Sequence, residues 1–457
     1  MNLGLDGTIT QYKNSGYYGL TGDVGSIVVV VSYAMPDKSS LYGGTSLILF
    51  LFLLFVMYYP HPIILERYAR VLINFALHGG QGVKPGDVVL LAVPECARSL
   101  LDYLYRAVID AGAHPVVRLI PDGLSAYLFE QGSDDQLTWT ARHSLLGEVE
   151  DIDHRVAIIA DHDKYELAHI DPKKIMLRQK SMKYYKDALF AKEDQGKLTR
   201  TLALYGTSSM AANVGMSLQE YRNQIINACF LDHEDPIAHW RQTFSFLEHT
   251  KSRLNALSIE RLHVQGEDVD LRIKIGANRQ RLGGSGRNIP SFELFISPDR
   301  RGTNGWMRFN QPLWRNGSVI KGIVLRFDNG VVVEATAQEG EQLLKEMIAV
   351  ENANKIGEYS LTDRRTSRID RIMGETLYDE NIGGLFGNTH LAIGSAYKES
   401  YRGDVASVSK DQRDERGFND SVIHTDIVST TNRVVTATLT DGSCVVIYRD
   451  GQFCDTF

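Results

Sequence analysis

The sequence predicts an α/β protein: an N-terminal α/β domain with a largely parallel sheet, followed by a C-terminal α+β domain that is mainly antiparallel. Strand-like and helical segments alternate with short links in the first half, as they do in βαβ units. The second half instead has alternating strand patterns and tight hairpin turns. At 457 residues the chain is also too long for one ordinary core, which favours two domains.

The N-terminal domain is expected to span residues 61–235. Residues 61–80 place apolar side chains at helical spacing and end in two glycines. The apolar run "GDVVLLAVP" follows, of the kind that is buried on both faces of a sheet. A helix over residues 97–111 and the strand-like segments "HPVVRLI", "RVAIIAD" and "TLALYG" continue the alternation. This order predicts parallel strands joined by helices.

The C-terminal domain is expected to span residues 236–457. A helix is predicted to start at Pro236, because proline is favourable in a first turn. The stretch "EDVDLRIKIG" alternates strictly, as a half-exposed antiparallel strand does. Asn329-Gly330 and Asp441-Gly442 each separate two strand-like runs and predict hairpins. A helix over "EQLLKEMIAVENANKIG" is predicted to end near Gly357.

Residues 1–60 follow neither pattern and form an atypical extension. The apolar run "LILFLFLLFVMYY", residues 47–59, is shorter than the about 20 residues that a spanning helix needs, and lies too far in for an ordinary signal peptide. It could be a weak membrane anchor, a buried or partner-binding segment, or upstream sequence wrongly joined to a frame that starts at Met57. We favour the third interpretation, because regular patterning begins directly afterwards, and do not favour membrane association.

Composition narrows the possible partners and compartment. A net charge of -7 argues against a nucleic-acid partner, because phosphate binding usually requires a basic surface. The four cysteines form no CxxC pair and no short-spaced framework, which suits free thiols in a reducing compartment.

Four short stretches of the second domain carry residues that their patterns do not explain. Glu293 interrupts the apolar strand-like run "IPSFELFISP", and Glu358 directly follows the glycine expected to end the preceding helix. "SVIHTDIVS" is predicted to be a strand with His424 and Asp426 on the same face. An isolated His-Asp pair usually faces solvent. Whether this pair belongs to a functional site therefore depends on the other three stretches.

The fourth stretch, "YDENIGGLFGNTHLAIGSAY", adds Glu380, His390 and Tyr397. His390 and Tyr397 are seven residues apart and would share a face if "THLAIGSAY" were a helix. Together the four stretches supply two imidazoles and three or four carboxylates. This set suits a pair of divalent ions such as zinc, cobalt or manganese, with one carboxylate bridging them.

The order of these motifs resembles a known family, the thermophilic-type metalloaminopeptidases (aminopeptidase T, aminopeptidase S and PepS-like enzymes). The resemblance runs from about residue 61 to the end and rests on FELF(x)SP, IGE, DEN…HLAIG(x)AY, HTD and YRDGQF. It implies a two-domain, cytoplasmic, usually homodimeric hydrolase that releases N-terminal amino acids from peptides. Two divalent ions per chain, zinc, cobalt, manganese or magnesium, would be its cofactors.

The resemblance also assigns the candidate residues. Five match the family's metal ligands: Glu293, Glu358, His390, His424 and Asp426. Tyr397 matches the active-site tyrosine, expected to donate a hydrogen bond to the developing oxyanion, and Glu380 matches the acid of the DEN motif, expected to shuttle a proton. Glu358 is the expected bridging ligand. One departure is a glycine-containing insertion that widens the gap between the DEN acid and the histidine from about five residues to ten, and it could displace Glu380.

Two other functions remain open from the residues. His390, His424 and Asp426 alone form a two-histidine, one-carboxylate set, which suits a mononuclear non-haem iron dioxygenase that cleaves dihydroxypyridine rings. Such a triad does not need Glu293 and Glu358, so their presence favours the peptidase. A non-enzymatic relative that kept the fold is the third possibility.

Overall fold

The structure is a computed structural model that describes residues 8–11, 17–22, 25–30, 56–315, 318–405 and 407–455. The chain forms two compact units, residues 1–66 and 67–457. The first contains an antiparallel sheet in the order β1-β2-β3-β4, with bounds Thr8–Gln11, Tyr17–Gly22, Gly25–Val30 and Val56–Pro60. Most of the apolar run at residues 47–59 lies outside the described residues. Within the described ranges, no helix is both long and apolar enough to cross a membrane.

The second unit begins with a five-stranded parallel sheet in the order β11-β8-β7-β5-β6. Its strands are β5 (Val88–Pro94), β6 (His114–Ile120), β7 (His154–Ile159), β8 (Thr199–Leu204) and β11 (Asn288–Ile289). The first four are the strands that the sequence predicts. Strand β5 lies between β7 and β6 and is almost completely buried, which explains its continuous apolar run. The short strand β11 was not predicted and joins the sheet from the second half of the chain.

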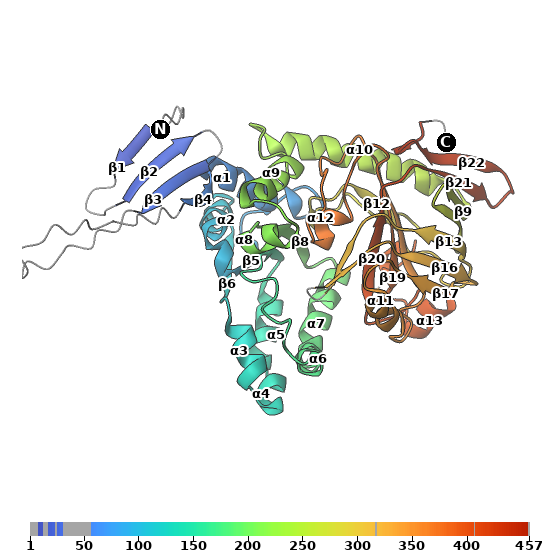
Figure 1. Cartoon of the computed structure of the whole chain (residues 1–457), viewed down its shortest axis with the longest axis horizontal. Helices are drawn as coiled ribbons and strands as arrows, with labels where there is room; N and C mark the ends of the chain where they lie inside the picture. The colour runs from blue at the N-terminus through green and yellow to red at the C-terminus, as the bar shows by residue number, and fades with distance from the viewer. Residues whose placement is uncertain are drawn as a thin grey trace, which may run out of the picture. The chain divides into compact units, whose positions relative to one another are not determined.

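Helices surround this sheet and also extend beyond it. Those next to the sheet include α1 (Pro62–Val71), the π-helix η1 (Leu72–Ala76), α2 (Arg98–Asp110), α8 (Ser208–Asn213) and α9 (Leu218–Ala228). Figure 1 shows a helical arm that extends away from the sheet. It consists of α3 (Leu124–Gln131), α4 (Asp134–Thr138), α5 (Arg142–Asp151), α6 (Pro172–Ser181) and α7 (Lys183–Asp194). Phe129, Leu137 and Ile170 form a small core within the arm.

The later part of the unit contains an eight-stranded antiparallel sheet in the order β17-β16-β13-β10-β9-β21-β22-β23. Its strands are β9 (Ile259–Gly266), β10 (Val269–Lys274), β13 (Asn304–Arg308), β16 (Val324–Asp328), β17 (Val331–Thr336), β21 (Arg433–Leu439), β22 (Cys444–Arg449) and β23 (Gln452–Phe453). Both predicted hairpins are present, and Asn329 and Gly330 have positive φ, as a tight hairpin turn requires. Helix α10 (Pro236–Ala256) starts at the predicted proline.

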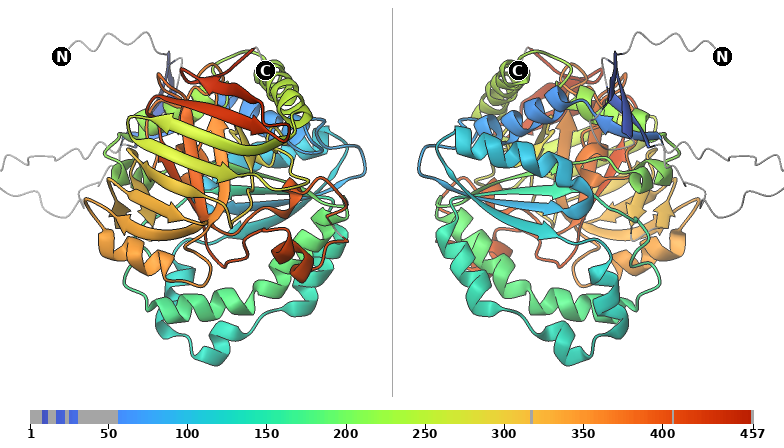
Figure 2. Two further views of the ribbon diagram at one scale, coloured as in Figure 1. Left: turned by 90° about the vertical axis from the view of Figure 1, so that its right-hand side faces the viewer. Right: turned by 90° about the vertical axis from the view of Figure 1, so that its left-hand side faces the viewer.

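A smaller antiparallel sheet carries the residues of interest, in the order β12-β18-β19-β20. Its strands are Glu293–Ile296, Ile356–Thr362, Asn388–Gly394 and His424–Ser429. In the left view of Figure 2 it lies behind the eight-stranded sheet. The two sheets are joined by hydrogen bonds from Tyr448 Oη to the Thr362 carbonyl (2.9 Å) and from Arg433 Nη2 to Ser429 Oγ (2.7 Å).

The helix predicted to start at Glu341 is present, but its predicted end near Gly357 is wrong. Helix α11 spans only Glu341–Ile348, and Gly357 lies inside strand β18 at a β-bulge. A Cβ at this glycine would lie 2.3 Å from the Ser395 carbonyl oxygen. The glycine therefore permits a close approach of two backbones rather than ending a helix.

The stretch "THLAIGSAY", which would place His390 and Tyr397 on one face only as a helix, is not helical. Its first part belongs to strand β19, Asn388–Gly394, which is buried along its whole length. A short strand buried on both faces has no polar alternation, so its sequence cannot be distinguished from a buried helix by periodicity. Three short helices flank β19 and β20 in the sequence: α12 (Thr376–Asp379), η3 (Lys398–Ser400) and α13 (Lys410–Glu415). A separate short hairpin consists of β14 (Leu313–Arg315) and β15 (Ser318–Ile320).

Candidate metal centre

All five predicted metal ligands lie on the four-stranded sheet and point to the same face. Glu293 starts β12, Glu358 lies in β18, His390 in β19, and His424 and Asp426 in β20. Residues that pair directly across strands project to one face. The first and last of these residues, Glu293 and Asp426, are 133 positions apart in the chain, and the strand register brings all five together.

The register also leaves space between the ligands. Ala392 pairs with Glu358 on one side and with Asp426 on the other, and Gly394 pairs with His424. Neither residue has a side chain large enough to fill the gap between the charged groups. The register therefore places two small residues beneath the charged groups, while the opposite face is filled by buried apolar residues such as Leu391.

His390 is the centre of the first group of contacts. Its Nε2 lies 3.0 Å from Glu358 Oε1 and 3.2 Å from Glu293 Oε2, and its Nδ1 bonds to the Glu380 carbonyl oxygen at 3.1 Å. A carbonyl can only accept, so Nδ1 carries a proton and Nε2 is the atom turned toward the carboxylates. This arrangement is typical of metal-binding histidines, whose second nitrogen donates to a carbonyl or carboxylate.

His424 forms the second group with the same orientation. Its Nδ1 donates to the Ser395 carbonyl at 2.8 Å, and its Nε2 lies 3.3 Å from Asp426 Oδ1 and 3.8 Å from Glu358 Oε2. The histidine is partly exposed, whereas the two carboxylates are buried. The predicted strand over "HTD" is thus confirmed, and its His-Asp pair faces other charged groups rather than bulk solvent.

Burial and neighbouring charges shift the pKa of several residues in this site. Burial raises the pKa of Glu358 to about 7, against the opposing effect of the His390 hydrogen bond. Burial also raises the pKa of Glu380, and the nearby charges of Glu293 and Asp426 raise it further. Burial lowers the pKa of His424, but the Asp426 carboxylate reverses this effect and brings it to about 9. Without a bound cation, these shifts favour a protonated Glu380 and charged histidines, because two imidazoles cannot neutralise four ionised carboxylates.

The donor atoms form two overlapping groups, each able to hold one ion. Glu293, Glu358 and His390 offer ligand atoms within 4.8 Å of one another, and so do Glu358, His424 and Asp426. Glu358 belongs to both groups. Together with Glu380, these residues supply four carboxylates, whose four negative charges would balance two divalent cations with both histidines neutral. The residues present thus fit two ions that share one carboxylate.

The glycine-containing insertion does not remove Glu380 from the site. The carbonyl oxygen of Glu380 accepts from His390 and, at 2.6 Å, from Asn388 Nδ2, so both ends of the inserted loop are held together. The Glu380 side chain is buried and lines a cavity with Asp426 and Trp314. The neighbouring Asp379 is directed elsewhere, since its carboxylate accepts from the backbone N–H of Met373.

Tyr397 reaches the same region from beyond the end of β19. Its ring lies 5.0 Å from that of His424 and 5.4 Å from that of Phe295, and its backbone N–H donates to Ser297 Oγ at 2.8 Å. Burial raises its pKa, and the charges of Glu358 and Asp426 raise it further, so its hydroxyl stays protonated. The structure thus places Tyr397 next to His424, although the segment that joins it to His390 is a strand and not a helix.

Sequence reasoning missed the groups that orient the ligands. Ser360 donates its hydroxyl to Glu293 Oε2 at 2.8 Å, and the carbonyls of Glu380 and Ser395 hold the two imidazoles. Ser360 is two residues after Glu358 in β18, so a strand prediction there would have placed both on one face. The carbonyls carry no signal in the sequence, because every residue has one.

Comparisons with known proteins agree with this architecture. A family described as "Thermophilic metalloprotease (M29)" matches residues 63–453. Aminopeptidase T of Thermus aquaticus is 31% identical over 250 residues, which are 52% of this chain and 59% of that enzyme. Aminopeptidase 2 of Geobacillus stearothermophilus is 26% identical over 415 residues, which are 85% of this chain and 97% of that enzyme. The chain thus matches somewhat more than half of the first relative and nearly all of the second.

A solved structure shares the fold. It is titled "Wild-type AmpT from Thermus thermophilus" and has a TM-score of 0.75 at 23% identity, covering 85% of this chain and 98% of its own. The likeness confirms the predicted fold class, a parallel sheet with helices followed by an antiparallel part. Because the family match includes every residue of the candidate metal centre, the chain belongs to the thermophilic metalloprotease family, M29.

Proposed function

We propose that this chain is a metal-dependent aminopeptidase that hydrolyses the first peptide bond of peptides with a free N-terminus, at a centre for two divalent ions. The observation that carries the proposal is the position of Glu358, which belongs to both groups of potential ligands. Family membership supports metal-dependent peptide hydrolysis, and the aminopeptidases among the relatives support cleavage at the N-terminus.

Glu293 and His390 would hold one ion, His424 and Asp426 the other, and Glu358 both. The nitrogen and carboxylate donors suit zinc, cobalt or manganese, and magnesium is the less usual partner for imidazole. When bound, the ions would act as Lewis acids that polarise the substrate carbonyl and lower the pKa of water. The protein's own contribution is to fix the donors: two carbonyls orient the imidazoles and Ser360 orients Glu293.

Glu380 is the residue we propose for proton transfer. It lies beside the ligands but its side chain is not a member of either ligand group. It also lines the cavity that opens next to Asp426. A carboxyl group in this place can take a proton from the attacking water and give it to the leaving amine. Leu313, Trp314 and Val428 line the same small cavity and give it an apolar wall.

Tyr397→Phe should reduce kcat by about 10²- to 10³-fold while the metal content stays unchanged. The hydroxyl is proposed to donate to the oxygen that becomes negative when the carbonyl is attacked, and loss of one such donor has an effect of this size. The ring contacts with His424 and Phe295 do not involve the hydroxyl, so phenylalanine should preserve the packing. Steady-state kinetics and metal analysis of both proteins check this. Unchanged kcat in the variant would remove Tyr397 from the mechanism.

The dioxygenase interpretation is not favoured. It needs only His390, His424 and Asp426, whereas Glu293 and Glu358 both lie within 3.2 Å of His390 Nε2. Two extra carboxylates so close to the ligand atom would add negative charge that a single ion has no need of. The family match points the same way.

Peptide hydrolysis in the presence and absence of a chelator tests the proposal. We expect release of free N-terminal amino acids from peptides, loss of this activity with a chelator, and recovery with zinc, cobalt or manganese. An N-acetylated peptide is the control and should not be cleaved, because it lacks the free amine. Oxygen uptake with a dihydroxypyridine, together with iron in place of these ions, would contradict the peptidase.

The remaining expectations are part of the same proposal. We propose that residues 61–235 and 236–457 act as an α/β domain and a catalytic domain, and that the enzyme works as a homodimer in the cytoplasm. The four cysteines are free thiols, as is usual in a reducing compartment. Size-exclusion chromatography with light scattering tests the oligomeric state directly.

A further inference from the structure

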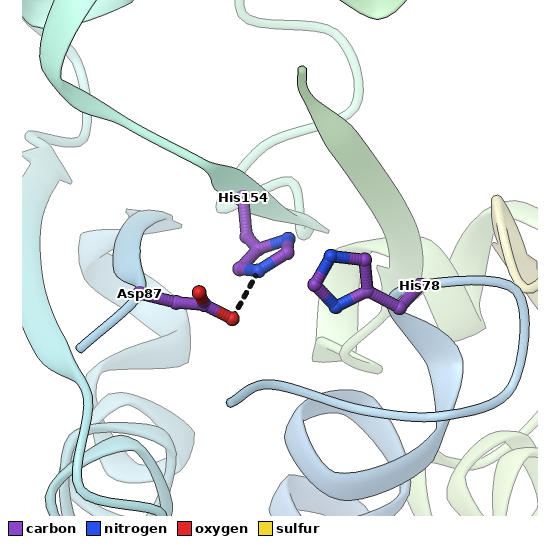
Figure 3. Close-up of side chains that lie close together, drawn as sticks. All are labelled: His78, Asp87 and His154. Carbon is purple, nitrogen blue, oxygen red and sulfur yellow. Dashed lines mark hydrogen bonds and ion pairs between the residues drawn. The ribbon is translucent and has the colours of Figure 1, made fainter. Parts of the chain in front are cut away.

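A second group of metal-type ligands lies at the amino end of the parallel sheet, apart from the four-stranded sheet. His154 is the first residue of β7, Asp87 directly precedes β5, and His78 lies in the loop that links η1 to β5. Their ligand atoms all lie within 4.8 Å of one another. Figure 3 shows the two imidazoles close together and the Asp87 carboxylate directed at His154. The proposed catalytic function does not use any of these residues.

Neighbouring groups orient both imidazoles through their Nδ1 atoms, and the Nε2 of His154 also contacts the proposed third ligand, Asp87. His78 Nδ1 donates a hydrogen bond to the Gly82 carbonyl at 3.1 Å. Its Nε2 therefore carries no proton, and its lone pair can bind a metal ion. His154 Nδ1 lies 2.7 Å from Thr199 Oγ1, and its Nε2 lies 2.9 Å from Asp87 Oδ2. In both residues Nδ1 is engaged and Nε2 is the atom available to an ion, as in histidines that bind metals.

Without an ion, His154 can satisfy both contacts as a neutral ring. Nε2–H would donate to Asp87, and the Thr199 hydroxyl would donate to Nδ1. With an ion on Nε2, the ring proton would move to Nδ1 and donate to Thr199 Oγ1. That oxygen already accepts from the His78 backbone N–H at 3.3 Å, and its second lone pair can accept from His154. The same neighbours therefore support the metal-binding tautomer without any rearrangement of the backbone.

The third ligand is also oriented and lacks a competing cation. Asp87 Oδ2 accepts from the backbone N–H of Lys84 at 2.7 Å, which fixes the carboxylate. Over the described part of the chain, Asp87 forms its ion pair with His154 and with no lysine or arginine. His154 is completely buried, whereas His78 and Asp87 are partly exposed, so an ion can enter from solvent.

We propose that His78, Asp87 and His154 bind a third divalent ion of the zinc class, which fastens the loop of residues 77–87 to the amino ends of β7 and β8. Two imidazoles and one carboxylate are typical zinc ligands, and water would take the fourth position. Ligands at 2.0–2.2 Å from a tetrahedral ion lie about 3.3–3.6 Å apart, so these three ligand atoms, now within 4.8 Å of one another, would have to approach by at most about 1.5 Å. The role of the ion is structural and independent of peptide hydrolysis.

The test compares the zinc content of the full-length wild type with that of His78→Asn. His78 has a positive φ of 50°, and asparagine tolerates this conformation, so the substitution should not strain the loop. After equilibration with buffered zinc, we expect wild type to hold one zinc ion more per chain than the variant. Because loss of an outer partner alone weakens metal sites about 10- to 100-fold, removal of a ligand should weaken this one at least about 100-fold. Peptidase activity should change less than about twofold.

A matched control and a second variant make the result specific. His263 pairs with Asp270 at 2.7 Å but belongs to no ligand group among the described residues, so His263→Asn should keep the wild-type zinc content. Asp87→Asn should lose the same ion as His78→Asn. Because the two substitutions are independent, the test still gives a result if one of the variants folds poorly. Zinc should also raise the unfolding temperature of wild type more than that of His78→Asn. Equal zinc content in wild type, His78→Asn and Asp87→Asn would overturn the proposal. The difference in zinc content between wild type and these variants reports only the proposed third ion. The test therefore succeeds or fails independently of the catalytic centre.

Discussion

Replacing Glu358 with glutamine should reduce kcat/KM for peptide hydrolysis by at least about 10³-fold and weaken the binding of both ions. Glu358 is the residue shared by the two ligand groups, with Oε1 toward His390 and Oε2 toward His424. A neutral amide has almost the same shape but cannot balance the charge of two cations. The Lewis-acid contribution that would be lost is worth several kcal/mol, and each 1.36 kcal/mol corresponds to a factor of ten in rate.

The same substitution should not unfold the protein. The carboxylate is buried beside Glu293, whose charge opposes its ionisation, so removing one negative charge relieves repulsion in the metal-free protein. Kinetics, metal content and thermal unfolding of the variant without metal separate the two effects. Glu334→Gln is a matched control, because Glu334 is an exposed glutamate in strand β17, and it should behave as wild type. Near-wild-type turnover of Glu358→Gln at saturating zinc would show that Glu358 bridges no ions.

A larger side chain between the ligands should also remove most of the activity. Ala392 is completely buried and pairs with both Glu358 and Asp426, so its side chain projects between them. In Ala392→Leu, three additional carbon atoms would occupy the space proposed for the ions. We expect activity to fall at least about 100-fold, with a loss of about 1–3 kcal/mol in the free energy of unfolding from overpacking.

Ala335→Leu separates blocked ion binding from simple overpacking. Ala335 is a buried alanine in strand β17 of the eight-stranded sheet, away from the metal ligands. It should lose comparable stability but keep its ions and its kcat. Metal content measured for both variants, with unfolding by denaturant, distinguishes the two. If Ala392→Leu bound ions as wild type does, the space over Ala392 would not be the ion site.

Local patterns marked several residues as unusual, and the family resemblance then assigned them as candidate ligands. The period of two in "HTD" places His424 and Asp426 on one face, and the interruption of an apolar run singles out Glu293. Glu358 and His390 were identified as candidate ligands although both lie in strands, which the local sequence did not predict. Gly357 is equally consistent with a helix end and with a bulge, and only its contact with the strand ending at Gly394 decides between them.

The relation between the ligands could not be predicted from local patterns. Ser360 lies opposite His390, and Ala392 lies opposite Asp426, because of the strand register, which depends on how distant segments pair. The group of His78, Asp87 and His154 illustrates the same limit. Its members are separated by up to 76 residues and follow no motif, and they meet because two strands of a parallel sheet start side by side.

Anomalous diffraction at the zinc absorption edge, from crystals grown with zinc, tests the two-ion centre most directly. We expect two peaks on the ligand-bearing face of the four-stranded sheet, one near Glu293 and His390 and the other near His424 and Asp426. Both should lie about 2.0–2.2 Å from an oxygen of Glu358. A single peak bound by His390, His424 and Asp426, with Glu293 and Glu358 unligated, would contradict the proposed centre.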